Sequence, residues 1–204
     1  MTDFTRYNKI ARWNRPVIVT EKLDGTNGAI VIEQWHEPWE DESVTAYVTS
    51  KDGWLYAVST QSRNRFITPG RDNYGFARWV ADHADLLVAT LGEGVHFGEW
   101  WGQGIQRRYG MQQKVFSLFN TSRWADYDFP EGFNGSLRCV PVLRILTAPK
   151  EEKIQEILED LRVNGSVASP GFMRPEGIIF YHVSANTGFK ITLENDDIPK
   201  SLLK

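Results

Sequence analysis

The stretch Val17-Ile-Val-Thr-Glu-Lys-Leu-Asp-Gly-Thr-Asn-Gly28 decides how the rest of the chain is interpreted. Its first part is apolar and β-branched, which predicts a strand, and Asp24-Gly25 then predicts a tight turn. The strand therefore delivers Lys22 to its own end, beside a turn that fixes the backbone. A lysine held in this way is a nucleophile once its amino group loses its proton, and desolvation or a nearby cation favours that loss. A solvated lysine beside a hairpin turn is the alternative interpretation.

Length and composition limit the classes of protein to consider. The chain has 204 residues, of which 41% are hydrophobic and 24% charged, and this ordinary globular composition excludes disorder, collagen and coiled coil. Its net charge of −3 means that any nucleic-acid contact must come from a local patch. A single cysteine, Cys139, excludes an intramolecular disulfide and predicts a reducing, cytoplasmic location. Because no apolar leader and no long apolar stretch is present, no membrane association is expected.

Short runs rich in Val, Ile and aromatic residues predict a chain made mostly of strands. The predicted strands are Val17–Thr20, Ala29–Glu33, Ser43–Thr49, Val95–Glu99, Lys114–Phe119, Arg138–Leu146, Gly177–Val183 and Gly188–Leu193. Apolar residues recur at helical spacing from Phe76 to Leu87 and from Ile154 to Leu161, which predicts two helices. Strands and helices do not alternate regularly. The expected fold class is therefore α+β, with largely antiparallel sheets and a few flanking helices.

Six segments, spread from Thr20 to Thr192, resemble in order the motifs of the covalent nucleotidyltransferases, the superfamily of ATP-dependent DNA ligases, RNA ligases and mRNA capping enzymes. They are Lys22-Leu-Asp-Gly25, Ser62-Arg-Asn-Arg65, His96-Phe-Gly-Glu-Trp-Trp-Gly102, Lys114-Val-Phe-Ser-Leu-Phe-Asn120, Pro175-Glu-Gly-Ile-Ile-Phe180 and Gly188-Phe-Lys-Ile-Thr192. Each is weak alone, but the ordered set is specific. Glu-Lys-x-Asp-Gly-Thr-Asn followed by Phe-Gly-Glu is most similar to the RNA ligase 2 family. The resemblance implies one adenylation domain over residues 1–204, with an ATP-grasp-like nucleotidyltransferase fold.

The resemblance also implies a role for each matching residue. Lys22 would attack the α-phosphorus of ATP and carry AMP as lysyl-AMP. Lys190 would neutralise phosphate charge and favour the neutral amine of Lys22, and Glu176 would bind Mg²⁺ or Mn²⁺. The other implied nucleotide contacts are Glu21 at the adenine edge, Asp24, Asn27, Arg63 on the ribose-phosphate side, Glu99 at a ribose hydroxyl, and Phe119 stacked on adenine.

The function implied is that of an ATP-dependent RNA ligase, which joins 5′-phosphate and 3′-hydroxyl ends through lysyl-AMP and an adenylylated 5′ end. RNA ends, in a nicked duplex or a broken strand, are the implied partner, with DNA or hybrid substrates as alternatives. The alternatives in function are a minimal DNA ligase core, a guanylyltransferase, and a binder of nucleic-acid ends without catalysis. Compact size suits a phage-encoded protein of RNA repair.

One loop adds a prediction about the nucleic-acid strand. Tryptophans, glycines and paired arginines between Trp100 and Arg108 suit a strand contact through Trp101, Arg107 and Arg108, to which we add Arg65. The alternative is that a tryptophan is core and the arginines are solvated.

The sequence departs from the superfamily in two places. The last motif has one lysine, Lys190, where two are usual, so either Thr192 or Gly188 occupies the other position. We also expect no carboxy-terminal OB or other lid domain, so that loops or a protein partner would close the site.

Overall fold

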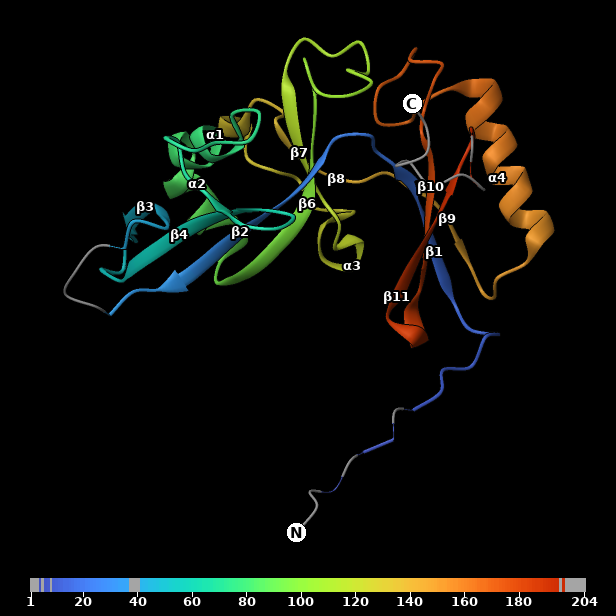
Figure 1. The fold of residues 1–204 in the computed structure, drawn as a ribbon, viewed down its shortest axis with the longest axis horizontal. Helices are drawn as coiled ribbons and strands as arrows, with labels where there is room; N and C mark the ends of the chain where they lie inside the picture. Colours follow the sequence, from blue (N-terminus) through green and yellow to red (C-terminus); the bar gives the residue numbers. More distant parts are fainter. Residues whose placement is uncertain (1–3, 5, 8, 37–40, 195, 197–204) are drawn as a thin grey trace. The chain divides into compact units, whose positions relative to one another are not determined.

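The computed structural model describes residues 4, 6–7, 9–36, 41–194 and 196. Contacts divide the chain into two compact units, one formed by Met1–Lys22 with Pro141–Lys204 and the other by Leu23–Val140. We call them the terminal unit and the central unit. Each has its own sheet, and strand pairs are antiparallel except for one in the central unit (Figure 1). The predicted α+β class with largely antiparallel sheets is confirmed, and the single domain over residues 1–204 stays a prediction.

The terminal unit is a four-stranded antiparallel sheet with one long helix. Its strand order is β11 (Thr187–Thr192), β10 (Gly177–His182), β1 (Val17–Lys22) and β9 (Val142–Leu146), and the short 3₁₀ turn η2 (Val183–Ala185) joins β10 to β11. Helix α4 (Glu151–Asn164) covers one face. Alternate residues of the central strands point to this face, as the period of two requires. The core that results is Val17, Val19, Leu146, Ile154, Ile157, Leu158, Leu161, Ile178 and Phe180.

The central unit is a larger sheet with two helices on one face. Its strands run in the order β3 (Val44–Thr49), β4 (Leu55–Ser62), β2 (Thr26–Gln34), β6 (Gly94–Gly102), β7 (Lys114–Leu118) and β8 (Leu137–Cys139), while β5 (Phe66–Ile67) pairs with β4. Helices α1 (Phe76–Asp82) and α2 (Ala84–Leu91) bury Phe76, Val80 and Leu87 against Trp100 and Phe116 of the sheet. Two short elements, α3 (Thr121–Trp124) and η1 (Glu131–Phe133), follow β7.

Two predictions about elements were wrong, and two strands were missed. The single helix predicted from Phe76 to Leu87 is two, because the backbone leaves the helical region at His83, whose φ is −118°. The strand predicted over Arg138–Leu146 is divided around Pro141 into β8 and β9, which belong to different units. Strands β4 and β5 were not predicted. In β4, serine, threonine and glutamine interrupt the apolar run and mask its strand character.

Candidate functional site

Lys22 is the last residue of β1, and its ε-amino group donates a hydrogen bond to Oε2 of Glu176. The antiparallel register places Lys22 opposite Gly177, the first residue of β10. Glu176 immediately precedes Gly177 and therefore lies next to Lys22. The two side chains are 17% and 2% exposed, respectively. Two motifs that lie far apart in the sequence therefore meet as a largely buried ion pair.

Gly177 makes this approach possible. Its φ is +151°, and a Cβ at this position would lie 2.1 Å from the carbonyl oxygen of Ile191 on β11. No side chain fits there, because real Cβ atoms do not approach backbone so closely. The Glu-Gly pair therefore combines a carboxylate aimed at Lys22 with a residue that lets β11 pack against β10.

Lys190 lies on the same face of the terminal sheet as Lys22. Register pairs Lys190 with Ile179, and Ile179 with Thr20, two residues before Lys22 on β1. Strand spacing and rise put the two lysine Cα atoms about 12 Å apart, a distance that long side chains can share around one phosphate chain. The Lys190 side chain is exposed. Its role toward phosphate stays a prediction.

Glu21 points to the opposite face from Lys22, and this corrects one assignment. Its carboxylate is 1% exposed and accepts hydrogen bonds from the Ser166 hydroxyl at 2.6 Å and from the backbone N–H groups of Val167 and Ala168, both at 2.9 Å. Burial raises the pKa of Glu21, and these three hydrogen bonds oppose the rise. The side chain is occupied by the loop after α4, so the prediction that it contacts the adenine edge was wrong. Its role is to position that loop.

In the central unit, Glu99 holds the turn that follows Lys22 in the sequence. Oε1 of Glu99 accepts a hydrogen bond from the Gly25 N–H at 3.1 Å, and Oε2 accepts one from the Asn27 side-chain amide at 2.7 Å. Asn27 and Glu99 are direct cross-strand partners on β2 and β6. The structure thus brings together Asn27 and Glu99, two of the residues that the resemblance implies as nucleotide contacts. A carboxylate of two oxygens has further lone pairs for a ribose hydroxyl.

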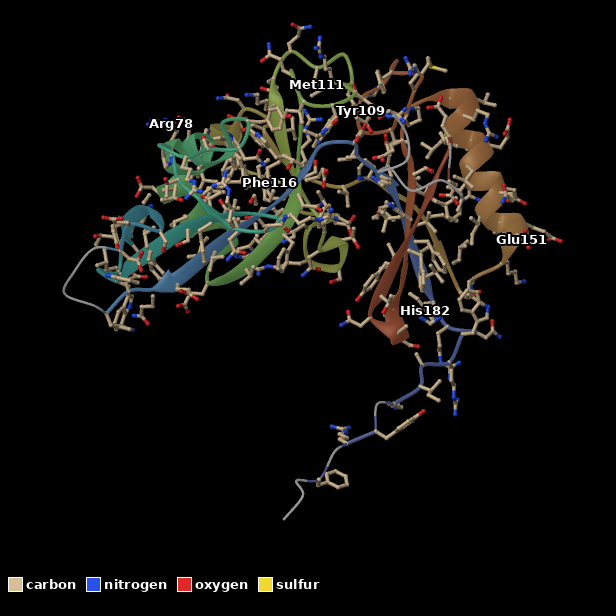
Figure 2. The ribbon with its side chains drawn as sticks, in the orientation of Figure 1. Arg78, Tyr109, Met111, Phe116, Glu151 and His182 are labelled. Carbon is tan, nitrogen blue, oxygen red and sulfur yellow. The ribbon has the colours of Figure 1, made fainter. Side chains whose placement is uncertain are left out.

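Two residues of the loop between β6 and β7 hydrogen-bond to Asp24. Its backbone N–H donates to the Tyr109 hydroxyl at 3.0 Å, and its carboxylate accepts from Nε of Arg107 at 3.2 Å. Tyr109 is 1% exposed and lies edge-on to Trp101 with ring centroids 5.0 Å apart (Figure 2). Sequence reasoning missed Tyr109. The available signal was an aromatic residue in a glycine-rich loop that also carries two arginines.

The structure of the same loop corrects part of the predicted contact with a nucleic-acid strand. Trp101 is fully buried, and its indole N–H donates to the Ser117 hydroxyl at 2.9 Å, so it offers no stacking surface. Arg107 is half-buried and paired with Asp24. Arg108 is exposed, and its contact with a nucleic-acid strand stays a prediction. The predicted alternative, a core tryptophan, is therefore the correct one for Trp101.

The remaining predicted residues are exposed. Phe119 follows β7 and is 42% exposed, and its stacking on adenine stays a prediction. Its N–H donates to the carbonyl of Phe97, which is 58% exposed and was not predicted. Arg63 and Arg65 lie in the β4–β5 turn, where Arg65 donates to the carbonyls of Phe66 and Arg71, both at 3.3 Å.

The donor set fits a divalent cation that is shared with a substrate. Within the described ranges, no three His, Cys, Asp or Glu side chains form a cluster able to hold a metal. Mg²⁺ and Mn²⁺ at phosphate sites commonly use one or two carboxylates and complete their shell with phosphate oxygens and water. The buried carboxylate of Glu176 fits that form of binding.

Comparison with solved structures supports the fold. Three solved structures of Naegleria gruberi RNA ligase variants match the fold. One without nucleotide has 19% identity and a TM-score of 0.52, covering 88% of this chain and 50% of that one. Two that contain ATP and Mn have 19% and 16% identity and TM-scores of 0.53 and 0.54, covering 88% and 89% of this chain and 50% and 51% of theirs. The chain thus spans about half the length of these structures.

In the parts of the chain that the structure describes, no helix has both the length and the apolar character needed to cross a membrane. Two further findings complete the comparison. No curated protein matches the chain. A family model described as RNA ligase matches residues 15–195, nearly the whole chain. The chain therefore belongs to the RNA ligase family.

Proposed function

We propose that the protein is an ATP-dependent RNA ligase that works through a lysyl-AMP intermediate on Lys22. The observation that carries the proposal is the contact between Lys22 and Glu176 at the ends of two adjacent strands. A rigid pair of strands holds one nucleophile beside one carboxylate, and the covalently adjacent turn is fixed by Glu99. Membership of the RNA ligase family supports the same reaction.

The first step would form a bond between Nζ of Lys22 and the α-phosphorus of ATP. The bond from that phosphorus to the bridging oxygen breaks, pyrophosphate leaves, and the amine gives up its proton. In the second step, a 5′-phosphate oxygen of RNA attacks the same phosphorus, and the P–N bond to Lys22 breaks. In the third, a 3′-hydroxyl attacks the 5′-phosphorus, and AMP leaves with the bonding electrons. Lys22 is regenerated at the second step.

Charge on phosphate oxygens is the main barrier in each step, and the chain supplies cations to meet it. Lys190 shares the exposed sheet face with Lys22 and would neutralise part of the charge. Glu176 would hold a divalent cation, which when bound supplies positive charge to the phosphates. Two matched Naegleria gruberi structures contain ATP and Mn, which supports this choice of nucleotide donor and metal.

Selection of the nucleotide would come from the central unit. The exposed ring of Phe119 provides a stacking surface for adenine. Glu99 would accept a hydrogen bond from a ribose hydroxyl while it holds Gly25 and Asn27. Arg63 would contact the phosphate side of the nucleotide or of the substrate end. RNA ends with a 5′-phosphate and a 3′-hydroxyl are the proposed partner.

The test is covalent labelling of the purified chain with ATP that carries a label on its α-phosphate. Wild type and Lys22→Arg are incubated with Mg²⁺ or Mn²⁺ and separated on a denaturing gel. The variant keeps a cation to face Glu176 but has no nucleophilic amine, so label on wild type alone is expected. Labelled GTP is the control for a guanylyltransferase. Absence of label in folded protein free of pre-bound AMP would refute the proposal.

Substrate choice is tested on protein that labels. Nicked duplexes of RNA, of DNA and of a hybrid are supplied with ATP, and the joined strand is measured on a sequencing gel. Joining of RNA ends is expected to be the fastest. Faster joining of an all-DNA nick would instead indicate a DNA ligase core.

A further inference from the structure

The segment before β1 repeats a three-residue pattern four times. Each triplet starts with an aromatic or aliphatic residue and ends with arginine or lysine. The triplets are Phe4-Thr-Arg6, Tyr7-Asn-Lys9, Ile10-Ala-Arg12 and Trp13-Asn-Arg15. We call residues 4–15 the arm. Asp3 is the only acidic residue before Pro16, although the chain has a net charge of −3. The arm is therefore a local basic segment on an acidic protein.

The apolar side chains of the arm contribute little to a core. The described residues of the arm belong to no helix or strand (Figure 1). Phe4, Tyr7 and Ile10 are 92%, 83% and 76% exposed, respectively. Single exposed apolar residues are ordinary, but a regular series of them between cations is not explained by stability of the fold. The series therefore suits a ligand outside the fold.

The last triplet anchors the arm to the terminal unit. Trp13 stacks on His182, with ring centroids 5.9 Å apart and an angle of 27° between the rings. Nδ1 of His182 accepts from the Ala185 N–H, which leaves Nε2 to donate to the Trp13 carbonyl at 2.7 Å. His182 is 2% exposed, so this anchor is fixed in the unit. Trp13 itself remains 62% exposed.

The described residues of the arm form no helix. Residues three apart in an α-helix advance by 300°, so a helix would place the four apolar side chains on one half of its circumference and the four cations on the other, as on a membrane surface. The structure does not show that conformation in the described residues. In a strand the apolar side chains would alternate between faces. An extended chain with three residues per turn aligns the apolar residues in one stripe and the cations in another. One stripe of apolar residues beside one stripe of cations matches a single-stranded nucleic acid, which exposes both bases and phosphates.

We propose that the arm binds a single-stranded polynucleotide, with bases stacked on Phe4 and Tyr7 and phosphates paired with the four cations. Stacking on aromatic rings and pairing with arginine or lysine need no particular base sequence. The natural occupant follows from the proposed function, on which this inference rests: it is the RNA strand whose end is joined. The arm would hold that strand while Lys22 carries out chemistry on its end.

The test measures binding of the full chain to a fluorescent oligouridine of about 20 nucleotides that lacks a 5′-phosphate, without ATP. In the charge variant, Arg6, Lys9, Arg12 and Arg15 become glutamine. In the matched control, the exposed residues Lys51, Arg78, Lys153 and Arg162 become glutamine, which removes the same number of positive charges elsewhere. In the aromatic variant, Phe4 and Tyr7 become alanine. These side chains are exposed, so all variants are expected to fold.

Salt dependence separates the two contributions. The logarithm of affinity falls against the logarithm of salt with a slope of about −0.7 per neutralised phosphate of a single strand, so the charge variant should reduce the slope by up to about 3. The control should leave the slope unchanged. The aromatic variant should bind at least about fivefold more weakly at the same slope. Equal binding by the charge variant and the control would overturn the inference.

Two further outcomes are decisive. Wild type that binds vesicles of phosphatidylserine and phosphatidylcholine but not the oligonucleotide would assign the arm to a membrane surface and refute the inference. Covalent labelling with ATP is measured on the same preparations. Arm-dependent oligonucleotide binding without labelling would refute the proposed function but support the arm as a polynucleotide site. Normal covalent labelling, together with oligonucleotide binding that does not depend on the arm, would refute the inference about the arm and leave the proposed function standing.

Discussion

The ε-amino group of Lys22 donates a hydrogen bond to Oε2 of Glu176, although 154 positions separate the two residues in the chain. The pairing of β1 with β10 brings them together, and burial of Glu176 strengthens the interaction. Attack on phosphorus needs the neutral amine of Lys22, aimed at the α-phosphorus. Glu176 therefore has two uses, because it orients the nucleophile and is also the candidate metal ligand.

This relationship predicts the effect of Glu176→Gln. The amide still accepts a hydrogen bond from Lys22 but carries no charge for a metal. Covalent labelling should slow by at least about tenfold and should need more Mn²⁺, while the melting temperature changes little. Labelling rates measured across a metal titration check this. Glu159→Gln, an exposed carboxylate on α4, is the control. An unchanged metal dependence would contradict the assignment.

Tyr109→Phe should weaken the loop that holds Asp24. The substitution removes the hydroxyl that accepts the Asp24 N–H and keeps the ring against Trp101. Loss of one partly buried hydrogen bond costs about 1 kcal/mol, and the turn after Lys22 gains freedom. We expect slower labelling with a small fall in melting temperature. Tyr127→Phe is the control, because its ring is 42% exposed. Equal labelling rates for both variants would remove Tyr109 from the site.

Phe119→Ala should weaken ATP binding more than it weakens the fold. The ring is 42% exposed, so its removal leaves little cavity. Base stacking on an aromatic ring contributes about 1–3 kcal/mol, which predicts at least about a fivefold rise in KM for ATP. Initial labelling rates against ATP concentration measure this. Phe66→Ala, with a ring 49% exposed on β5, is the control. If Phe97→Ala raised the KM for ATP and Phe119→Ala did not, the stacking surface for adenine would be the ring of Phe97, and the assignment of Phe119 would be wrong.

The sequence predicted the main residues of two clusters, one in each unit, because several of them are tied to local pattern. An apolar strand, a turn and an ordered set of motifs located Lys22, Asn27, Glu99 and Glu176. The α+β class followed from short strands with few helices. Strand β4 escaped because its polar residues interrupt the apolar run. Its identity depends on pairing with β2 and β3, which are non-local contacts.

Side-chain direction was the main source of error. Glu21 and Lys22 are neighbours in sequence, yet a strand sends them to opposite faces, and Glu21 meets the 166–168 loop. Trp101 was predicted to contact a nucleic-acid strand, with a core tryptophan as the alternative, but the loop after β6 returns and covers it with Tyr109. Neither fact follows from composition or motif. Both require the path of a loop, which for Glu21 is also far away along the chain.

Gly25→Ala should destabilise the fold, although Gly25 does not need an unusual backbone angle. A Cβ there would lie 2.4 Å from the Trp100 carbonyl oxygen, so glycine lets the turn pack directly on β6. Overpacking of this kind costs about 1–3 kcal/mol. Denaturant unfolding measures it. Gly70→Ala is a matched control, because a Cβ at that position has nothing within 4 Å. Equal stability of the two variants would contradict the close approach.

The buried carboxyl of Glu21 predicts a pH dependence of stability. Its pKa is raised above the ordinary 4.5, chiefly by burial, so the folded chain holds this proton more tightly than the unfolded chain does. The resulting stabilisation is complete below the unfolded pKa and is lost as pH rises through the folded pKa. Glu21→Gln cannot ionise. The melting temperature of wild type relative to this variant should therefore fall over the pH range that begins at the ordinary pKa of 4.5 and extends upward.

Differential scanning fluorimetry across that pH range checks the sign. Glu152→Gln, an exposed residue in the first turn of α4, is the control and should show no comparable fall. The hydrogen bonds from Ser166, Val167 and Ala168 act in the opposite direction, because they favour the carboxylate. If they outweighed burial, the relative melting temperature would rise with pH. The sign of the slope thus decides whether desolvation or hydrogen bonding controls the carboxyl that positions the 166–168 loop.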